Sequence, residues 1–401
     1  MDDPATHRRD GRGRRSRHGI VRRRPRRRIL RRVTARIVTL RAESAEPAAI
    51  IERLAAVRQG GDVPLVVDDR WPAGMRAEIE RLAADTTLPA DVAWATTTSG
   101  STGAPRIVIR SAASWEASFA AIERLLDARD DDRMLLPGPA SSSLTLFSLA
   151  HALAGGPPPV TSESRAAATL FHGTPSHLRA LLADRPSGLR AALVGGADLD
   201  ESLRGEAEAA GVRVVSYYGA AELSFVAVDE DGRGLRAFPG VEIDVRSREV
   251  RVRSPFVAHG YLGAAGPLRR QGEWASVGDR GTIGDGVLRL DGRADDAIVS
   301  GGVSVVPADV ERVLRDLPGV ADAVVVGVPR LGVGALVAAL VEPRPGATPD
   351  PAALRAAAAA VLAPAHVPRL WFVGDVPRTT TGKPARADVR RMLHGGGASR
   401  A

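Results

Sequence analysis

The chain has 401 residues, of which 44% are hydrophobic and 25% charged, so it is expected to fold into two or three domains. It contains no cysteine, which excludes disulfide bonds, thiolate metal sites, iron–sulfur clusters and a cysteine nucleophile. No run of about 18 apolar residues occurs, which argues against a membrane span, and no apolar stretch of roughly 7–15 residues follows the basic start, as a secretory signal would require. We therefore expect a cytoplasmic protein.

The formal charge of +8 is unevenly distributed along the chain. Residues 1–41 carry 16 arginines and three aspartates, a balance of +13, and the remaining residues have a balance of −5. A run of like charges repels itself and cannot bury a core, so residues 1–41 are predicted to form a disordered tail. Such an arm could bind nucleic acid through phosphate charge, but it has no Phe, Tyr or Trp for stacking on bases. We interpret it as an incidental extension.

From residue 42 the pattern is that of a folded α/β protein. Apolar residues at helical spacing predict a helix around 50–57, and an apolar run predicts a buried strand at 63–67. The polar stretch 96–106 follows, then a strand at 107–109 and an amphipathic helix over 115–126. Short strands and helices alternate from there to about residue 200, as in an α/β sheet.

The second half of the chain shows a change of pattern. Apolar and polar residues alternate within 241–261, which predicts antiparallel strands. A smaller unit is expected from about residue 296, with a helix that Pro307 begins, strands at 323–328 and 335–341, and an alanine-rich helix near 352–362. The Gly/Ser-rich end, 395–401, is predicted to be frayed.

A loop rich in glycine and hydroxyl groups is the first candidate site. Residues 98–103 read Thr-Ser-Gly-Ser-Thr-Gly and lie between two predicted strands. Glycines allow backbone N–H groups to turn inward and hydroxyls add donors, so the loop could wrap a phosphate. It lacks the Gly-Lys-Ser/Thr ending of a Walker loop and the spacing of a dinucleotide fingerprint. Taken alone, it is equally compatible with a flexible linker.

Two further segments carry groups that could bind parts of a nucleotide. Residues 217–222 read Tyr-Tyr-Gly-Ala-Ala-Glu, in which a glycine beside an aromatic ring could hold a flat heterocycle. Glu222 could hold a hard cation such as Mg²⁺, although a solvated glutamate is the simpler interpretation. Asp279, after Gly278, could accept hydrogen bonds from two ribose hydroxyls or could serve as a turn residue.

The last two segments lie in the smaller unit. Residues 292–311 place two glycine turns around a short apolar strand, and a helix follows. Residues 377–386 form a loop that presents Lys383, the one lysine among 55 basic residues. A compact ammonium and a forked guanidinium are not interchangeable at a reacting centre. Taken alone, a single lysine is more often a surface residue than a catalytic one, so its neighbours decide its role.

Together and in this order, these segments resemble those of the adenylate-forming superfamily, which contains acyl-CoA synthetases, peptide-synthetase adenylation domains and luciferases. Residues 98–106 follow the phosphate loop of that family, with Arg106 in place of lysine, and residues 218–222 match its Tyr-Gly-X-Thr-Glu segment. Residues 278–279 match the ribose-binding aspartate, residues 292–311 the hinge segment, and residues 377–386 the loop of the catalytic lysine. The resemblance spans about residues 95–390.

The resemblance implies both a fold and a reaction. The fold class is α/β, with a large N-terminal domain of mixed sheets and helices over 42–294 and a small mobile α+β domain over 295–394. The reaction is the ligation of a small carboxylic acid in two steps: the carboxylate attacks the α-phosphate of Mg²⁺-ATP to give an acyl-adenylate and pyrophosphate, and a thiol, usually that of coenzyme A, then displaces AMP.

The resemblance also implies residue roles. Lys383 and Glu222 would be catalytic, Glu222 would hold Mg²⁺, and Asp295 would be the hinge. The residues predicted to bind ATP are Thr98, Ser99, Gly100, Ser101, Thr102, Gly103, Arg106, Gly195, Gly196, Ala197, Tyr217, Tyr218, Gly219, Asp279 and Arg293. The acid pocket is expected around 141–147, 171–175 and 223–225.

Several features depart from the family pattern. Ala221 replaces a threonine, Arg106 replaces a lysine, and residues 138–143 lack a histidine that members often carry near the acyl pocket. The segment 42–97 is short, and in this the chain resembles the o-succinylbenzoate–CoA ligases of menaquinone synthesis, which would make its acid an o-succinylbenzoate-like one. Two alternatives stay open: an enzyme that loads a carrier-protein thiol, and a degenerate member that binds ligand without turnover. Binding of nucleic acid by the tail ranks last.

Overall fold

The computed structural model describes residues 35–42, 47–71, 73–84, 86–98, 106–161, 163–263, 266–293, 298–300, 303–330, 334–362 and 366–394. Predictions for residues 1–34, 99–105 and 395–401 and for Asp295 lie outside these ranges. The predicted end of the tail is wrong, because Ile37–Ala42 form strand β1. The strand pairs with β2. The charge of the surrounding arginines led to the prediction of disorder, although residues 37–42 include apolar ones. No helix in the described ranges has the length and hydropathy needed to span a membrane.

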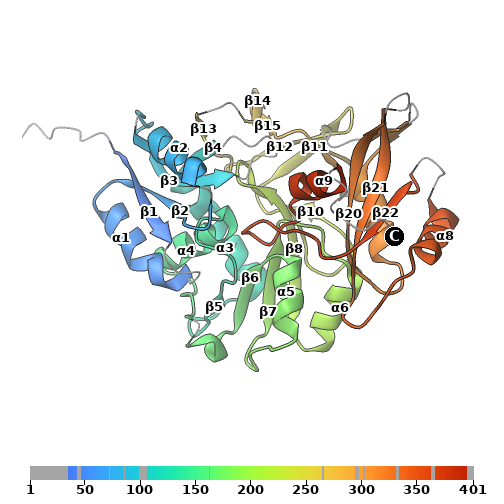
Figure 1. The fold of residues 1–401 in the computed structure, drawn as a ribbon. Coiled ribbons are helices and arrows are strands. Elements are labelled where there is room, and N and C mark those ends of the chain that lie inside the picture. The colour runs from blue at the N-terminus through green and yellow to red at the C-terminus, as the bar shows by residue number, and fades with distance from the viewer. Residues whose placement is uncertain are drawn as a thin grey trace, which may run out of the picture. The chain divides into compact units, whose positions relative to one another are not determined.

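The first sheet has the strand order β1-β2-β3-β4-β13 (Figure 1). Strands β1, β2 (Val63–Asp68) and β3 (Val92–Thr98) are parallel, and β4 (Arg106–Ser111) and β13 (Gly260–Gly263) are antiparallel to their neighbours. Every residue of β2 is buried. The side chains of this strand belong to two hydrophobic clusters, one that includes α1 (Ile51–Gln59) and one that includes α2 (Ala73–Ala84). The predicted helix and strand here are confirmed.

The second sheet has the order β10-β9-β8-β7-β6-β5. Its parallel strands are β5 (Met134–Leu135), β6 (Leu170–Gly173), β7 (Ala191–Gly195) and β8 (Arg213–Ala220), and β9 (Ser224–Asp229) and β10 (Arg236–Ala237) are antiparallel. Helices α3 (Ala113–Leu126) and α4 (Ser143–Leu153) pack on one face, and α5 (Pro175–Leu182) and α6 (Glu201–Ala209) on the other.

The third sheet is antiparallel, which confirms the alternation seen in the sequence after residue 241. Its order is β14-β15-β12-β16-β17, and β11 pairs with β12. The strands are β11 (Glu242–Arg246), β12 (Glu249–Arg253), β14 (Arg269–Gln271), β15 (Trp274–Ser276), β16 (Asp279–Gly284) and β17 (Val287–Arg293). The turn before β16 brings Asp279 to its first position.

The fourth sheet belongs to the C-terminal unit and has the order β19-β18-β21-β20, with β22 paired to β21. Its strands are β18 (Ile298–Ser300), β19 (Val303–Val305), β20 (Val320–Arg330), β21 (Gly334–Pro343) and β22 (Leu370–Val373). Helices α7 (Pro307–Arg315) and α8 (Pro351–Val361) pack on one face, and α9 (Arg386–His394) on the other. The helix at Pro307, the two strands and the alanine-rich helix are confirmed.

Gly219, near the end of β8, has no room for a side chain. A Cβ atom there would lie 2.1 Å from the backbone oxygen of Ser224, so we expect Gly219→Ala to lower the free energy of unfolding by about 2 kcal/mol or more. Gly205→Ala is the matched control, because Gly205 lies in α6 with no atom within 4 Å. That change should stabilise the protein by about 0.5–1 kcal/mol. Urea unfolding measures both, and similar values for the two variants would contradict the steric explanation.

Candidate active site

A cavity of about 1590 Å³ lies where the carboxyl ends of β7 and β8 meet the loop that carries Lys383. In α/β sheets this end of the strands is where ligands bind. The predicted site residues that line the cavity are Arg106, Gly196, Ala197, Tyr217, Tyr218, Gly219, Glu222, Asp279 and Lys383. Gly195 lies beneath the Tyr217 ring instead, where a Cβ would be 2.3 Å from Cζ of that ring.

Other predicted residues are not described in full. Ser99, Gly100, Ser101, Thr102, Gly103 and Asp295 lie outside the described residues, as do the side chains of Thr98 and Arg293. The backbone places Thr98 opposite Arg106, and Arg293 opposite Asp279, in neighbouring antiparallel strands. The phosphate loop and the hinge therefore stay predictions.

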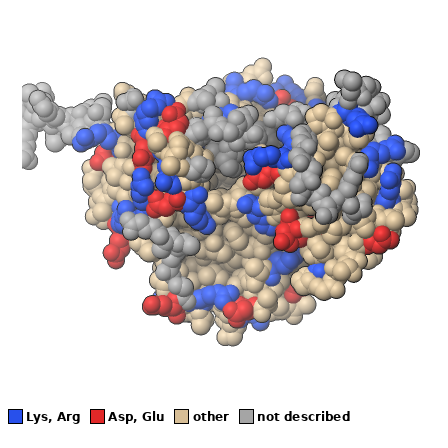
Figure 2. Space-filling view, in the orientation of Figure 1, with Lys and Arg blue, Asp and Glu red and all other residues tan. Residues whose placement is uncertain are grey.

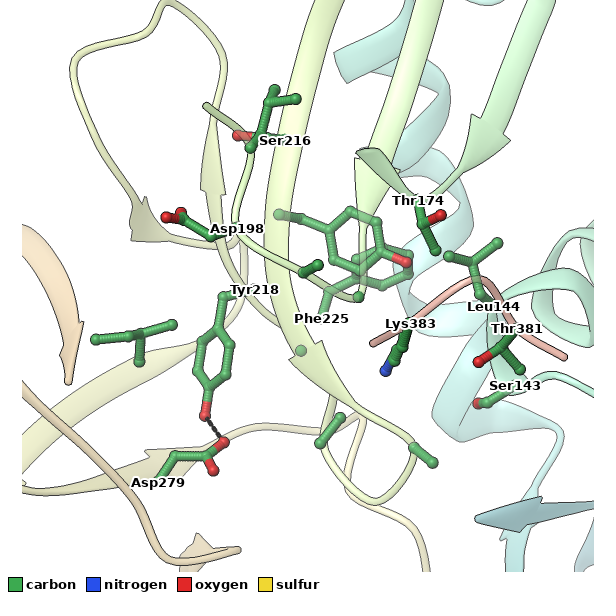
Figure 3. Close-up of a pocket in the computed structure, with 18 of the residues that line it drawn as sticks. Ser143, Leu144, Thr174, Asp198, Ser216, Tyr218, Phe225, Asp279, Thr381 and Lys383 are labelled. Carbon is green, nitrogen blue, oxygen red and sulfur yellow. Dashed lines mark hydrogen bonds between the residues drawn. The ribbon is translucent and has the colours of Figure 1, made fainter. Parts of the chain in front are cut away.

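Lys383 extends into the cavity from a tight turn (Figure 3). The turn is closed by a hydrogen bond from the Thr379 N–H to the Lys383 carbonyl, at 2.7 Å. The hydroxyl of Ser176, in α5, joins the turn to that helix by donating to the Gly382 carbonyl at 2.9 Å. Gly196 makes room for the lysine, since a Cβ there would be 3.0 Å from Cε and 3.6 Å from Nζ of Lys383. The side chain is accessible within the cavity, yet the surrounding protein lowers the pKa of Lys383 by desolvation, and Glu222 and Asp279 oppose that shift.

Asp279 and Tyr218 form one side of the cavity. The Tyr218 hydroxyl donates a hydrogen bond to Oδ2 of Asp279 at 2.5 Å, and Figure 3 shows the pair on one side of the Lys383 ammonium. Ser143, Leu144 and Thr174 lie on the other side of the ammonium (Figure 3). Lys383 therefore lies between two groups of lining residues, which we call the two arms of the cavity.

Glu222 is buried, with 6% of its surface exposed. Its Oε1 accepts a hydrogen bond from the Tyr261 hydroxyl at 2.8 Å, and its carbonyl accepts one from the Ala258 N–H at 2.7 Å. Burial and the Glu222 carboxylate raise the pKa of Tyr261, which keeps that hydroxyl a donor. No described residue donates a hydrogen bond to Oε2 of Glu222. A free carboxylate oxygen suits Mg²⁺, which takes one or two carboxylates together with phosphate oxygens.

The described residues hold no group of three or more His, Asp or Glu side chains that could bind a metal ion by themselves. This finding is compatible with the predicted use of Glu222, because an ion held mainly by nucleotide phosphates needs few protein ligands. The bound cation stays a prediction.

Arg110 in β4 is a functional candidate that the sequence reasoning missed. It is fully buried, and its guanidinium lies 4.8 Å from the centroid of the Trp115 ring. It donates hydrogen bonds to the carbonyl oxygens of Phe256, at 3.1 Å, and Ala221. Burial lowers the pKa of Arg110 to about 9, and the charge of Glu222 opposes this shift. Arg110 thus fixes the backbone directly before Glu222. The sequence feature that could have identified Arg110 is its position directly after the apolar run 107–109, where a charged residue is unusual.

We expect Arg110→Ala to reduce stability by about 2–4 kcal/mol, because it leaves a cavity beside Trp115 and two carbonyls without their donor. Arg58→Ala is the control: Arg58 also lies over an indole, 5.6 Å from the Trp94 centroid, and bonds one carbonyl, but it is half-buried. Its loss should cost less than about 1 kcal/mol. Equal losses of unfolding free energy in urea would show that Arg110 has no special structural role.

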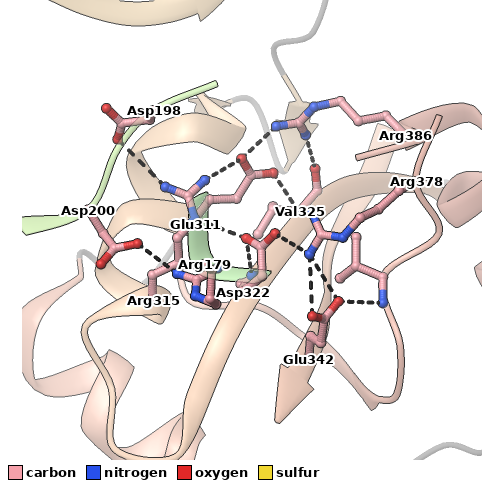
Figure 4. Close-up of polar contacts among 12 residues, drawn as sticks. Arg179, Asp198, Asp200, Glu311, Arg315, Asp322, Val325, Glu342, Arg378 and Arg386 are labelled. Carbon is pink, nitrogen blue, oxygen red and sulfur yellow. Dashed lines mark hydrogen bonds and ion pairs between the residues drawn. The ribbon is translucent and has the colours of Figure 1, made fainter. Parts of the chain in front are cut away.

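Ion pairs tie the loop of Lys383 to the fourth sheet at one end and to α7 at the other (Figure 4). Arg378 pairs with Asp322 at 2.9 Å and with Glu342 at 3.1 Å. Arg386 pairs with Glu311 at 2.5 Å. One further ion pair joins α7 to the turn after β7. It forms between Arg315 and Asp198, at 3.6 Å, and Asp198 is two residues after Gly196. These contacts hold Lys383 in place relative to Gly196.

Parts of the segments expected to form the acid pocket line the cavity, and their role in binding the acid stays a prediction. Residues 141–145, Phe147, His172, Thr174 and Phe225 line the cavity, whereas Phe171 and Leu223 are buried elsewhere in the core.

Charged side chains of both signs are interspersed on the face of the molecule shown in Figure 2.

The chain belongs to the AMP-binding enzyme family. The model of that family matches residues 22–268, and the model of the AMP-binding enzyme C-terminal domain matches residues 309–383. The class is that of AMP-forming acyl-CoA ligases. The resemblance and the fold class predicted from the sequence are therefore confirmed.

Particular relatives agree with this class. An uncharacterized acyl–CoA ligase of Bacillus subtilis (strain 168) is 30% identical over 355 residues, which cover 79% of this chain and 72% of the relative. The 2-succinylbenzoate–CoA ligase of Escherichia coli (strain K12) is 29% identical over 269 residues, or 62% of this chain and 58% of that protein. A solved structure of an E. coli MenE variant with bound OSB-AMS has a TM-score of 0.79 and 24% identity, covering 90% of this chain and 88% of the other.

Proposed function

We propose that this protein joins a small carboxylic acid to coenzyme A through an acyl-adenylate. The acid carboxylate attacks the α-phosphate of ATP, the bond to pyrophosphate breaks, and the thiol sulfur of coenzyme A then attacks the acyl carbon and releases AMP. The observation that supports this most is the position of Lys383, whose ammonium lies where the two arms of the cavity meet.

In this proposal one arm binds the nucleotide. Asp279, with Tyr218 beside it and Arg293 opposite it in register, accepts the ribose hydroxyls. Gly196, Ala197, Tyr218 and Gly219 frame the adenine, and residues 98–103 with Arg106 hold the phosphates. Glu222 holds Mg²⁺, which supplies neutralisation of phosphate charge. The other arm, around Ser143 and Phe225, binds the body of the acid.

Lys383 bridges the reacting carboxylate and the α-phosphate oxygens. Both groups are negative, and a fixed ammonium between them lowers their repulsion and stabilises the charge of the transition state. The unit 295–394 must carry Lys383 away before the thiol can reach the acyl carbon, and Asp295 is the expected hinge for that rotation.

The pH profile of adenylation tests the protonation of Lys383. Its pKa lies below the ordinary lysine value of 10.5, and the reaction needs the ammonium, so activity should fall as pH rises through that lowered pKa. The alkaline limb of pyrophosphate exchange should therefore begin below the pH expected of a free lysine. In Lys383→Arg the guanidinium stays charged, so the slower exchange should lose this limb. A limb that persists unchanged in Lys383→Arg would assign it to another group.

The acid and the thiol acceptor are the open parts of the proposal. The E. coli relative named above acts on 2-succinylbenzoate, which makes an aromatic keto acid a natural first candidate. A carrier-protein thiol is the alternative acceptor, and a non-catalytic binding protein is the alternative that Ala221 suggests.

One experiment decides among these. Pyrophosphate exchange is measured across a panel of aromatic, fatty and amino acids, and AMP release is then measured with and without coenzyme A. Exchange with at least one acid and AMP release that depends on coenzyme A support the ligase. Exchange without a response to coenzyme A favours a carrier protein, and no exchange with any acid overturns catalysis.

A further inference from the structure

Three polar side chains form a hydrogen-bonded chain in the wall of the cavity. The Tyr217 hydroxyl lies 3.0 Å from Nε2 of His172, and Nδ1 of His172 lies 2.7 Å from the Ser148 hydroxyl. His172 is fully buried and Ser148 is 6% exposed, whereas Tyr217 is half-buried and lines the cavity. The chain therefore runs from the core to the cavity.

The sequence predicts that Tyr217 binds ATP, but the contacts of its side chain place it in the acid arm. Adjacent strand residues point to opposite faces, and the two tyrosines of β8 follow this rule. Tyr218 reaches Asp279, while the Tyr217 ring lies 4.6 Å from the Phe225 ring, centroid to centroid. Phe225 in turn contacts Phe147 at 4.9 Å. The ring of Tyr217 thus packs among the aromatic rings of this arm.

The number of protons on Ser148, His172 and Tyr217 leaves two possible directions for the hydrogen bonds between them. Burial lowers the pKa of His172 to about 3, so the imidazole is neutral and carries one N–H. With the hydroxyls of Ser148 and Tyr217, the three groups have three protons and form two hydrogen bonds with one another. One proton is left over, and it belongs to one end of the chain.

The leftover proton is best placed on Tyr217. If it belonged to Ser148, a buried hydroxyl would lack an acceptor, because His172 is the one hydrogen-bond partner of that hydroxyl among the described residues. An unsatisfied buried donor is costly. If Ser148 donates to Nδ1 and Nε2–H donates to Tyr217, the free proton faces the cavity, where a ligand atom can accept it.

We propose that the Tyr217 hydroxyl, oriented by His172 and Ser148, donates a hydrogen bond to an uncharged oxygen in the body of the acid substrate. The proposal rests on the ligase function above and names its substrate class: a flat or aromatic acid with a keto, ether or hydroxyl oxygen. The acceptor oxygen is uncharged, because a second negative group on the acid would need a cation beside it. Lys383 already pairs with the reacting carboxylate. Among the described residues assigned to this arm, none supplies a further cation, because His172 is neutral and the others are Trp115, residues 141–145, Phe147, Thr174 and Phe225.

The test compares pairs of acids that differ in one oxygen: phenoxyacetate with hydrocinnamate, β-benzoylpropionate with γ-phenylbutyrate, and para-methoxybenzoate with para-ethylbenzoate. The kcat/KM of pyrophosphate exchange for each acid is measured at saturating ATP. The wild-type protein should prefer the oxygen-bearing member of at least one pair by about tenfold or more. In Tyr217→Phe this preference should shrink to about twofold or less, with kcat/KM for the partner lacking the oxygen unchanged.

Two variants complete the design. Tyr218→Phe removes the neighbouring hydroxyl from the nucleotide arm, so it should raise the KM for ATP and leave the preference between paired acids intact. Ser148→Ala removes the group that sets the imidazole tautomer, so it should reduce the preference without removing the Tyr217 hydroxyl.

Three results would overturn the proposal: no preference in any pair, a preference that survives in Tyr217→Phe, or an equal loss for both members of a pair. Equal loss would mean that Tyr217 acts on the carboxylate that all acids share. If no acid supports exchange, the ligase function itself fails, and this inference fails with it. Exchange without preference refutes this inference alone.

Discussion

Replacing Lys383 by alanine should lower pyrophosphate exchange by at least about a hundredfold, because the charge that stabilises the adenylation transition state is lost. Thioester formation from a supplied acyl-adenylate should continue, since the ammonium is not required once the mixed anhydride exists. Exchange and thioester formation are measured separately in the same preparation. This split between the two half-reactions distinguishes a role in chemistry from a loss of folding.

The control for that variant is Arg390→Ala. Arg390 is an exposed cation of α9 in the same unit, and its removal changes the net charge equally without touching the cavity. Both half-reactions should be unaffected in this control. Unchanged exchange in Lys383→Ala would refute the assigned role, and an equal loss in both half-reactions would indicate damage to the fold.

Replacing Asp279 by alanine should weaken ATP binding by about tenfold to a hundredfold, because charge-assisted hydrogen bonds to the ribose hydroxyls are lost. Calorimetry of ATP binding measures this directly, without need of the acid. Asp244→Ala is a suitable control, because Asp244 lies in the same sheet and pairs with Arg246 away from the cavity lining. Normal ATP affinity in Asp279→Ala would remove Asp279 from the nucleotide site.

Much of the fold was predictable from local periodicity. The helical spacing within 115–126 marks the face of α3 that packs on the second sheet, and alternation after residue 241 marks β11 and β12. Predictions of this kind succeed because each element buries its apolar residues in a pattern fixed by its own geometry. The tail boundary failed because the apolar residues of β1 form a strand that is visible only once β2 is beside it.

The candidate site was predictable where residues are adjacent in the chain and not where they meet only in space. The segments around Glu222 and Lys383 carry recognisable local patterns, and both reach one cavity. The chain from Ser148 through His172 to Tyr217 joins three separate elements, α4, β6 and β8. No local pattern in any of them points to the other two.

The passage of oxygen from the acid to AMP is the most direct test of the acyl-adenylate. An acid labelled with oxygen-18 in its carboxylate is incubated with the protein, ATP and coenzyme A, and the products are weighed by mass spectrometry. Attack on the α-phosphate leaves one labelled oxygen in AMP when the thiol breaks the acyl–oxygen bond, and pyrophosphate stays unlabelled. Label in inorganic phosphate with formation of ADP, or AMP without label, would contradict the proposed reaction.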